Sequence, residues 1–198
     1  MSESPETPDD APDRGALMVA TGEGYARLAL DAARAIRDAA PGLALDLFTD
    51  ADTARALGPE LAAAFDRVTP LPQVWARSKI DGMAASRFAR SLYLDADIRA
   101  LADFTDAFDL LERFDLALAH DPARNAAECN VVWRKPLPAA FPQYNSGVLA
   151  YRRTPEVLAF LAAWAEAVRA HGTGRDQPAL RELLWETDLR VATLPDTY

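Results

Sequence analysis

The start of the chain alternates a short apolar run, an amphipathic segment and a second apolar run, and this order constrains the fold most. Residues 16–20 (ALMVA) and 43–48 (LALDLF) are almost free of charge, as expected of strands buried on both faces. Between them, apolar side chains recur at helical spacing over 25–36, and Pro41-Gly42 ends that helix. A strand, a helix and a strand within about 35 residues form a βαβ unit, which predicts parallel strands.

The same alternation continues to the end of the chain. Thr154-Pro155-Glu156 is a strong helix start, because it offers a hydroxyl cap, a proline at the first position and an acid in the first turn. Further helices are predicted at 60–65, 79–88, 104–112, 154–172 and 177–185, and further strands at 67–71, 91–94, 115–119, 147–151 and 189–194. Residues 121–142 hold several prolines without a clear period and are expected to form a loop. The pattern predicts an α/β fold in which helices flank a central, mostly parallel sheet.

The composition narrows the classes of function that such a domain can have. Its 198 residues and 50% hydrophobic content suit one domain with a packed core. A formal net charge of -9 argues against binding to nucleic acid or to an anionic membrane, because phosphate groups attract a basic surface. Cys129 is the only cysteine, so an intramolecular disulfide is excluded and a reducing, cytoplasmic location is expected. No apolar run is long enough for a transmembrane helix, and residues 1–14 lack the basic start and the apolar run of a secretory signal, so a soluble protein is expected.

Residues 1–14 differ in character from the rest of the chain. They are rich in proline, serine and acidic residues and contain almost nothing to bury. We predict a disordered acidic tail over 1–14 and a single folded domain over 15–198.

The sharpest local feature is Asp95-Ala96-Asp97, which follows the apolar run at 91–94. In an extended chain, carboxylates at i and i+2 share one face, and together they need a counter-charge. A hard divalent cation with oxygen ligands supplies it, and the C-terminal ends of strands are where open α/β sheets bind ligands. Asp95 and Asp97 are therefore candidate ligands for Mn²⁺ or Mg²⁺. Two solvated acids at an ordinary strand end remain the alternative.

Four other short motifs accompany the two aspartates in a fixed order. They are Thr21-Gly22-Glu23-Gly24-Tyr25, Arg77-Ser78-Lys79, Asn145-Ser146-Gly147-Val148 and Asp176-Gln177. With these motifs, residues 15–198 resemble the nucleotide-sugar-dependent glycosyltransferases of the GT-A fold, and most of all glycosyltransferase family 8 and the glycogenin-like group. The resemblance implies a GT-A-like fold and metal-dependent transfer of a hexose from a nucleoside diphosphate sugar, with UDP expected, to a hydroxyl acceptor of unknown identity. It also implies that the anomeric configuration is retained.

The resemblance implies a metal-binding role for the paired aspartates and catalytic roles for residues of two other motifs. Asp95 and Asp97 would hold Mn²⁺ or Mg²⁺ against the two phosphates of the donor. Asp176 and Gln177 would lie at the sugar hydroxyls and the reacting carbon, and Asn145 would lie beside the transferred sugar. These three residues are the expected catalytic residues.

Six further residues of these motifs, together with Asp121 after the strand predicted at 115–119, are expected to bind the donor. They are Thr21, Tyr25, Arg77, Lys79, Asp121, Ser146 and Gly147. A glycine lets the backbone approach a ligand, and arginine offers paired hydrogen bonds to phosphates and sugar hydroxyls. Trp75, which adjoins Arg77, is a candidate platform for the acceptor. Simple structural interpretations also exist, such as a helix-face aromatic for Tyr25 or a helix cap for Asp176.

One feature departs from the family, and two alternatives stay open. Family 8 enzymes supply a third metal ligand, a histidine, from a segment beyond the last strand, and neither His120 nor His171 fits that position. A member that binds a nucleotide sugar or a partner without turnover is the first alternative. A haloacid-dehalogenase-type phosphatase is the second, because its nucleophile motif is also an apolar strand ending in Asp-x-Asp. That motif needs threonine or valine near i+4, where this chain has Arg99.

Overall fold

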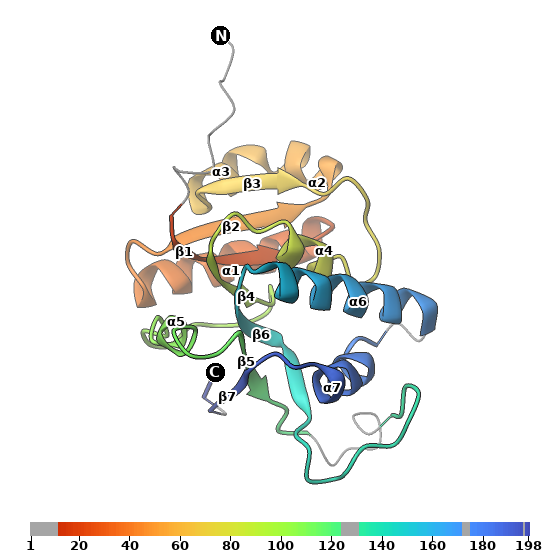
Figure 1. Cartoon of the computed structure of the whole chain (residues 1–198). Helices are drawn as coiled ribbons and strands as arrows, with labels where there is room; N and C mark the ends of the chain where they lie inside the picture. The colour runs from red at the N-terminus through yellow and green to blue at the C-terminus, as the bar shows by residue number, and fades with distance from the viewer. Residues whose placement is uncertain (1–11, 124–130, 172–174, 196) are drawn as a thin grey trace.

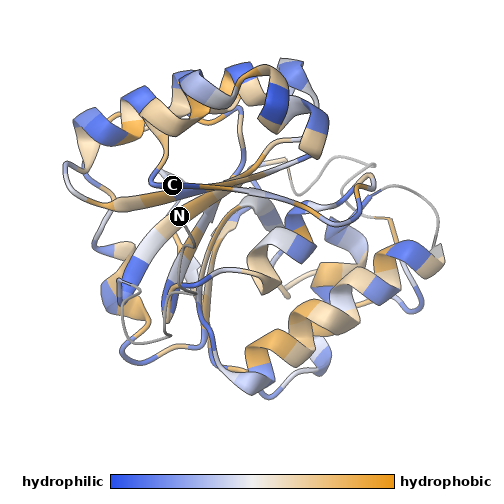
Figure 2. Ribbon diagram, turned by 90° about the horizontal axis from the view of Figure 1, so that it is seen from above, coloured by the Kyte–Doolittle hydropathy of each residue, from blue (hydrophilic) through white to orange (hydrophobic). Residues whose placement is uncertain are grey.

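The computed structural model describes residues 12–123, 131–171, 175–195 and 197–198, in which helices lie on both faces of one sheet (Figure 1 and Figure 2). The strands are β1 (Arg14–Val19), β2 (Ala44–Thr49), β3 (Arg67–Pro70), β4 (Arg90–Leu94), β5 (Leu116–His120), β6 (Tyr144–Arg152) and β7 (Val191–Leu194). The helices are α1 (Glu23–Ala39), α2 (Ala51–Ala56), α3 (Gly58–Ala64), α4 (Lys79–Ala84), α5 (Ala107–Leu110), α6 (Pro155–His171) and α7 (Gln177–Glu186). Among these helices, none is both long and apolar enough to span a bilayer.

The sheet is mostly parallel, as the sequence predicts. Its strand order is β3-β2-β1-β4-β6-β5-β7. Strand β6 is antiparallel to both of its neighbours, β4 and β5, whereas the other neighbouring strands pair in parallel. The C-terminal ends of the six parallel strands therefore meet at one edge of the sheet, together with the N-terminal end of β6. Open α/β sheets bind ligands at this edge.

Apolar layers cover both faces of the sheet because successive side chains of each strand point in opposite directions. In β1, Ala16 and Met18 join the layer that contains the buried faces of α1, α3 and α5. Leu17 joins the other layer, which contains the buried faces of α4, α6 and α7. Trp164 of α6, which is fully buried, is the largest side chain of that second layer. The apolar runs in the sequence are thus strands that are buried on both faces.

The beginning of the fold lies earlier than the sequence predicts. Strand β1 starts at Arg14, inside the segment predicted to be a tail, while residues 1–11 lie outside the described part of the chain. The carbonyl oxygen of Asp13 accepts a hydrogen bond of 2.9 Å from the backbone N–H of Arg90. The Asp13 carboxylate also pairs with the Arg90 guanidinium. These contacts extend the β1–β4 pairing beyond the expected boundary at residue 15.

Three helices also differ from the prediction. Helix α4 ends at Ala84 rather than at residue 88, because Ser86 and Phe88 turn inward and are buried. Only Ala107–Leu110 of the predicted helix at 104–112 is α-helical. Helix α2 was not expected; Asp50 caps it, accepting a hydrogen bond of 2.8 Å from the backbone N–H of Thr53.

Replacing Gly15 by alanine is expected to destabilise the fold. A Cβ atom at this position would lie 2.4 Å from the ring of Phe88, which is fully buried and has no room to move. We expect the free energy of unfolding, measured by urea denaturation, to fall by about 1–3 kcal/mol. Gly58→Ala is the matched control, because a Cβ there meets nothing within 4 Å. Equal stabilities of the two variants would contradict the prediction.

Candidate active site

A cavity of about 270 Å³ lies at the C-terminal edge of β1 and β4. Three segments line it: the turn after β1, the loop before α4 and the turn after β4. The predicted site residues in its lining are Thr21, Tyr25, Arg77, Lys79, Asp95 and Asp97. Trp75 lines it as well. Three motifs that are far apart in the sequence therefore meet at one cavity.

The two aspartates reach the cavity through a turn rather than through an extended chain. Strand β4 ends at Leu94, and Ala96 and Asp97 form a turn, which corrects the expectation that the carboxylates share one face of a strand. The turn lets Ile98 pack against the α1 side of the core. Asp95 is half-buried and Asp97 is exposed, and both still line the same cavity.

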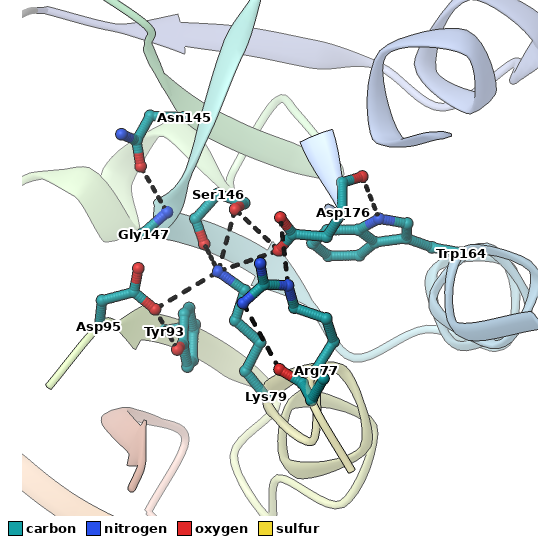
Figure 3. A network of polar contacts seen from close by, with 10 residues as sticks. Arg77, Lys79, Tyr93, Asp95, Asn145, Ser146, Gly147, Trp164 and Asp176 are labelled. Carbon is teal, nitrogen blue, oxygen red and sulfur yellow. Dashed lines mark hydrogen bonds and ion pairs between the residues drawn. The ribbon is translucent and has the colours of Figure 1, made fainter. Parts of the chain in front are cut away.

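Lys79, the first residue of α4, is the centre of the polar network beside this cavity (Figure 3). Its Nζ atom lies 2.9 Å from Oγ and 3.1 Å from the carbonyl oxygen of Ser146. It also lies 3.1 Å from Oδ2 of Asp176 and 3.4 Å from Oδ1 of Asp95. One ammonium group therefore joins the end of β4, strand β6 and the start of α7.

Asp176 immediately precedes α7, but its carboxylate does not cap that helix. It is buried, accepts a hydrogen bond of 3.0 Å from Ser146 Oγ, and has the Nε atom of Arg77 at 3.7 Å from Oδ1. The indole N–H of Trp164 donates to its backbone carbonyl oxygen at 3.0 Å and fixes the backbone. Burial alone would raise the pKa of Asp176, but the charges of Lys79 and Arg77 outweigh burial and lower that pKa. The helix-cap interpretation of this acid is thus wrong, since the carboxylate is turned to the cations.

A bulge in β6 presents the predicted Asn145-Ser146-Gly147 segment. In the β5–β6 pairing Leu118 lies opposite Leu149 and His120 lies opposite Tyr144, so the residues 145–148 face only Ala119. Such a bulge changes the direction of the side chains that it contains. Here it places both the hydroxyl and the carbonyl oxygen of Ser146 at Lys79.

Gly147 provides a close approach between β6 and the first aspartate. Its backbone N–H donates to Oδ1 of Asn145 at 2.6 Å, and its carbonyl oxygen accepts from the backbone N–H of Asp95 at 2.8 Å. A Cβ atom at this position would lie 2.8 Å from Oδ2 of Asp95 and 2.9 Å from Oδ1 of Asn145. Only glycine leaves this carboxylate oxygen clear.

The two oxygens of the Asp95 carboxylate have different environments. Oδ1 accepts a hydrogen bond from the hydroxyl of Tyr93 and lies next to Lys79. Burial, reinforced by the charge of Asp95, raises the pKa of Tyr93 well above its ordinary value, so the hydroxyl stays protonated and donates. Oδ2 has no hydrogen-bond partner among the described residues. It is the oxygen beside which Gly147 leaves space.

The carboxylates fit a small divalent cation as two of its ligands. Asp95 and the exposed Asp97 both line the cavity, and hard cations prefer carboxylate oxygens as donors. Within the described part of the chain, no group of three His, Cys, Asp or Glu side chains is placed to hold a metal. Oxygens of a bound diphosphate, or water, would therefore complete the coordination of Mn²⁺ or Mg²⁺.

The structure does not bring every predicted site residue to the cavity. Asp121 is buried and accepts a hydrogen bond of 2.9 Å from the backbone N–H of Ala123, away from the cavity lining. Gln177 is the first residue of α7 and is half-buried, also outside the lining. Cys129 and the side chain of His171 lie outside the described residues.

Tyr93 and Trp164 belong to the network but were missed in the sequence. Tyr93 lies two residues before Asp95, so strand alternation was a signal for it, whereas the helical period marks Trp164 only as a buried residue of its helix. Asp50, at the end of β2, accepts a hydrogen bond of 2.6 Å from the backbone N–H of Gly22 and so fixes the turn after β1. Although burial acts in the other direction, this bond and that from Thr53 lower the pKa of Asp50 to about 2.

The comparison with protein families gives one match. The model of the nucleotide-diphospho-sugar transferase family matches residues 65–198, a range that contains the paired aspartates, Lys79 and Asp176. Among curated protein sequences, none is similar enough to this chain to count as a match.

Solved structures share the fold at low sequence identity. The galactosyltransferase LgtC in complex with donor and acceptor sugar analogs has a TM-score of 0.64 at 16% identity, over 90% of this chain and 72% of that chain. The apo form of the glycosyltransferase GlyE of Streptococcus pneumoniae TIGR4 has a TM-score of 0.69 at 18% identity, over 94% of this chain and 46% of that chain. Mouse xyloside xylosyltransferase 1 has a TM-score of 0.57 at 15% identity, over 95% of this chain and 87% of that chain. The predicted GT-A-like fold is confirmed.

Proposed function

Because the chain belongs to the nucleotide-diphospho-sugar transferase family and is a glycosyltransferase, we propose that it transfers a hexose from UDP-hexose to a hydroxyl acceptor. The observation that carries this proposal is the cavity in which two cations and two carboxylates meet. Arg77 and Lys79 suit the phosphates and the sugar, while Asp95 and Asp97 suit a divalent cation. A diphosphate needs such neutralisation in a protein with a net charge of -9.

Asp95 and Asp97 would hold Mn²⁺ or Mg²⁺ in this site. When bound, the cation supplies positive charge that stabilises the departing diphosphate. Tyr93 and Lys79 hold Oδ1 of Asp95, which leaves its other oxygen, Oδ2, for the cation. Lys79 Nζ also lies 3.1 Å from Oδ2 of Asp176, so its positive charge stands between the carboxylates of Asp95 and Asp176.

The remaining residues would bind and orient the sugar and the nucleoside. Asp176 is ionised and accepts hydrogen bonds, which suits it to the hydroxyls of the transferred sugar. We assign Gln177 to the neighbourhood of the reacting carbon, and Asn145, Ser146 and Gly147 to the transferred sugar; Asp121, which is buried outside the cavity lining, receives no role in this proposal. Thr21 and Tyr25, which follow β1 and also line the cavity, would contact the nucleoside. Catalysis would then consist of positioning and electrostatic stabilisation, with retention of the anomeric configuration.

A thermal-shift measurement tests the donor site. UDP with Mn²⁺ at about 100 times its dissociation constant adds about 2.7 kcal/mol to the stability. The melting temperature of a protein of this size should then rise by about 5–10 °C. We expect EDTA to remove the shift and Asp97→Asn to reduce it strongly, because the variant lacks a proposed metal ligand. The substitution should leave the fold intact, since Asp97 is exposed and its side chain makes no hydrogen bond or ion pair among the described residues.

Asp109→Asn is the matched control for this test. It removes the same charge from an exposed position on α5, outside the cavity, and should keep the full shift. If no nucleoside diphosphate shifts the wild-type protein, with or without Mn²⁺, the proposed donor site is wrong. Hydrolysis of UDP-glucose or UDP-galactose then separates a turning-over enzyme from a member that only binds the donor.

A further inference from the structure

Trp75 is the largest side chain in the lining of the cavity. It lies in the loop between β3 and α4 and lines the cavity together with Arg77 and Lys79. Trp75 is half-buried, so part of its side chain is accessible. Tyr93, another aromatic of the lining, is buried, and its hydroxyl donates to Asp95. A pyranose has hydroxyl edges and apolar C–H faces, so a sugar site needs a flat apolar surface beside its polar groups. Trp75 provides that surface.

The loop holds the backbone of Trp75 in place. The buried side chain of Ser78 accepts from the backbone N–H of Trp75 at 2.8 Å and donates to its carbonyl oxygen at 2.9 Å. The backbone N–H of Ser78 donates to the same carbonyl oxygen at 3.1 Å. Both polar groups of the Trp75 main chain are therefore used before any ligand arrives.

Two side chains from other elements fix the ring of Trp75. The indole N–H donates to Oδ2 of Asp81, on α4, at 2.5 Å. The guanidinium of Arg169, on α6, lies over the ring at 4.2 Å from its centre and donates to both carboxylate oxygens of Asp81 at 2.9 Å. Asp81 and Arg169 together hold the indole edge and cover one face of the ring.

This arrangement adds little to stability, so its value lies in orientation. The side chains of Arg169 and Asp81 are 49% and 34% exposed, and exposed ion pairs of this kind contribute little to folding. Tyr25, the other aromatic with an exposed ring in the cavity, is 62% exposed and has no such contacts among the described residues. A ring that is held at its edge and on one face meets a ligand in a fixed orientation, at a low entropy cost.

We propose that Trp75 is a fixed platform for the C–H face of a pyranose ring, and that Asp81 and Arg169 are its positioning residues. The inference rests on the proposed function, because that function makes the ligand of this cavity a sugar. Either the hexose of the donor or the saccharide acceptor supplies the same ring chemistry. The experiment therefore has one arm for each source.

The first arm compares UDP with UDP-glucose and UDP-galactose, each titrated calorimetrically with Mn²⁺ into the full chain. If the platform carries the donor sugar, Trp75→Leu weakens UDP-hexose binding about tenfold and changes UDP binding less than about twofold. Trp75→Phe keeps a ring but loses the N–H to Asp81, and should lie in between. Trp185→Leu is the matched control, because Trp185 is 47% exposed and is not part of the cavity lining.

The second arm measures binding of methyl glucoside, methyl galactoside and lactose to the protein with UDP and Mn²⁺, by titration calorimetry. If the platform carries the acceptor, Trp75→Leu loses this binding and keeps its full affinity for UDP-hexose. Arg169→Met should raise KM for whichever sugar uses the platform, with kcat unchanged, and Arg169→Lys should restore part of the loss. If Trp75→Leu binds every ligand like the wild type, or Trp185→Leu loses as much, the platform is refuted. Failure of the wild type to bind UDP would instead refute the proposed function.

Discussion

Replacing Lys79 by methionine is expected to lower the free energy of unfolding by about 3 kcal/mol at neutral pH and to abolish turnover of the donor. The ammonium group of Lys79 lies 3.1 Å from Oδ2 of Asp176, and the two side chains are only 13% and 8% exposed. Its removal leaves a buried carboxylate with Arg77 at 3.7 Å as its nearest remaining cation. Urea denaturation and hydrolysis of UDP-hexose measure the two effects.

The pH dependence identifies the cause of this loss of stability. In the wild type the pKa of Asp176 is lowered below 3.8, so its contribution to stability is complete above that pH and is lost as the pH falls through the folded-state pKa. Without Lys79, burial should raise the pKa of Asp176, and protonation at low pH then relieves the buried charge. The difference in stability between wild type and variant should therefore be largest at neutral pH and shrink toward pH 4.

A double variant provides the control. Lys79→Met combined with Asp176→Asn removes both charges, and should be more stable at neutral pH than Lys79→Met alone, because no carboxylate is left unpaired. Neither protein should turn over the donor. A Lys79→Met protein as stable as the wild type at pH 7 would show that the contact does not carry the energy that we assign to it.

The centre of the sheet was predictable from the sequence because strands such as β1 and β2 are apolar on both faces. A short, uncharged apolar run such as 16–20 is typical of a strand buried on both faces. The helices between such runs were predicted from apolar side chains that recur at helical spacing. The short helix α2 has no apolar period, with one buried residue in its six, and it depends on the cap from Asp50. The bulge in β6 was not predictable, because no residue type marks it and it appears only in the pairing with β5.

Sequence motifs named many of the residues that line the cavity, but not the contacts between them. Motif order places Lys79, Asp95 and Asp176 in one family pattern, yet it gives no distance between them. The carboxylate of Asp176 faces Lys79 instead of capping α7, which depends on where α7 docks against β6. The contact between Arg169 and the ring of Trp75 likewise depends on the packing of α6 against α4, which the sequence does not show.

Replacing Gly147 by alanine is expected to remove most of the Mn²⁺-dependent binding of UDP and to lower the rate of donor turnover about 100-fold. The added methyl group would lie 2.8 Å from Oδ2 and 3.3 Å from Cγ of Asp95, so this carboxylate has to move. Tyr93 and Lys79 hold its other oxygen, and the movement therefore disturbs the position in which Asp95 would bind the cation. Thermal shifts with UDP and Mn²⁺ measure the loss of binding.

A second variant shows which of the two crowded oxygens matters. The methyl group would also lie 2.9 Å from Oδ1 of Asn145, and Asn145→Ala removes that contact but leaves the one with Asp95. The Asn145→Ala/Gly147→Ala protein should therefore lack the metal-dependent shift as much as Gly147→Ala does, while Asn145→Ala alone keeps it. If Gly147→Ala binds UDP with Mn²⁺ as the wild type does, Oδ2 of Asp95 is not the oxygen that the cation needs. The pairing of Asp95 with Asp97 as metal ligands would then be wrong, even with the fold and the family unchanged.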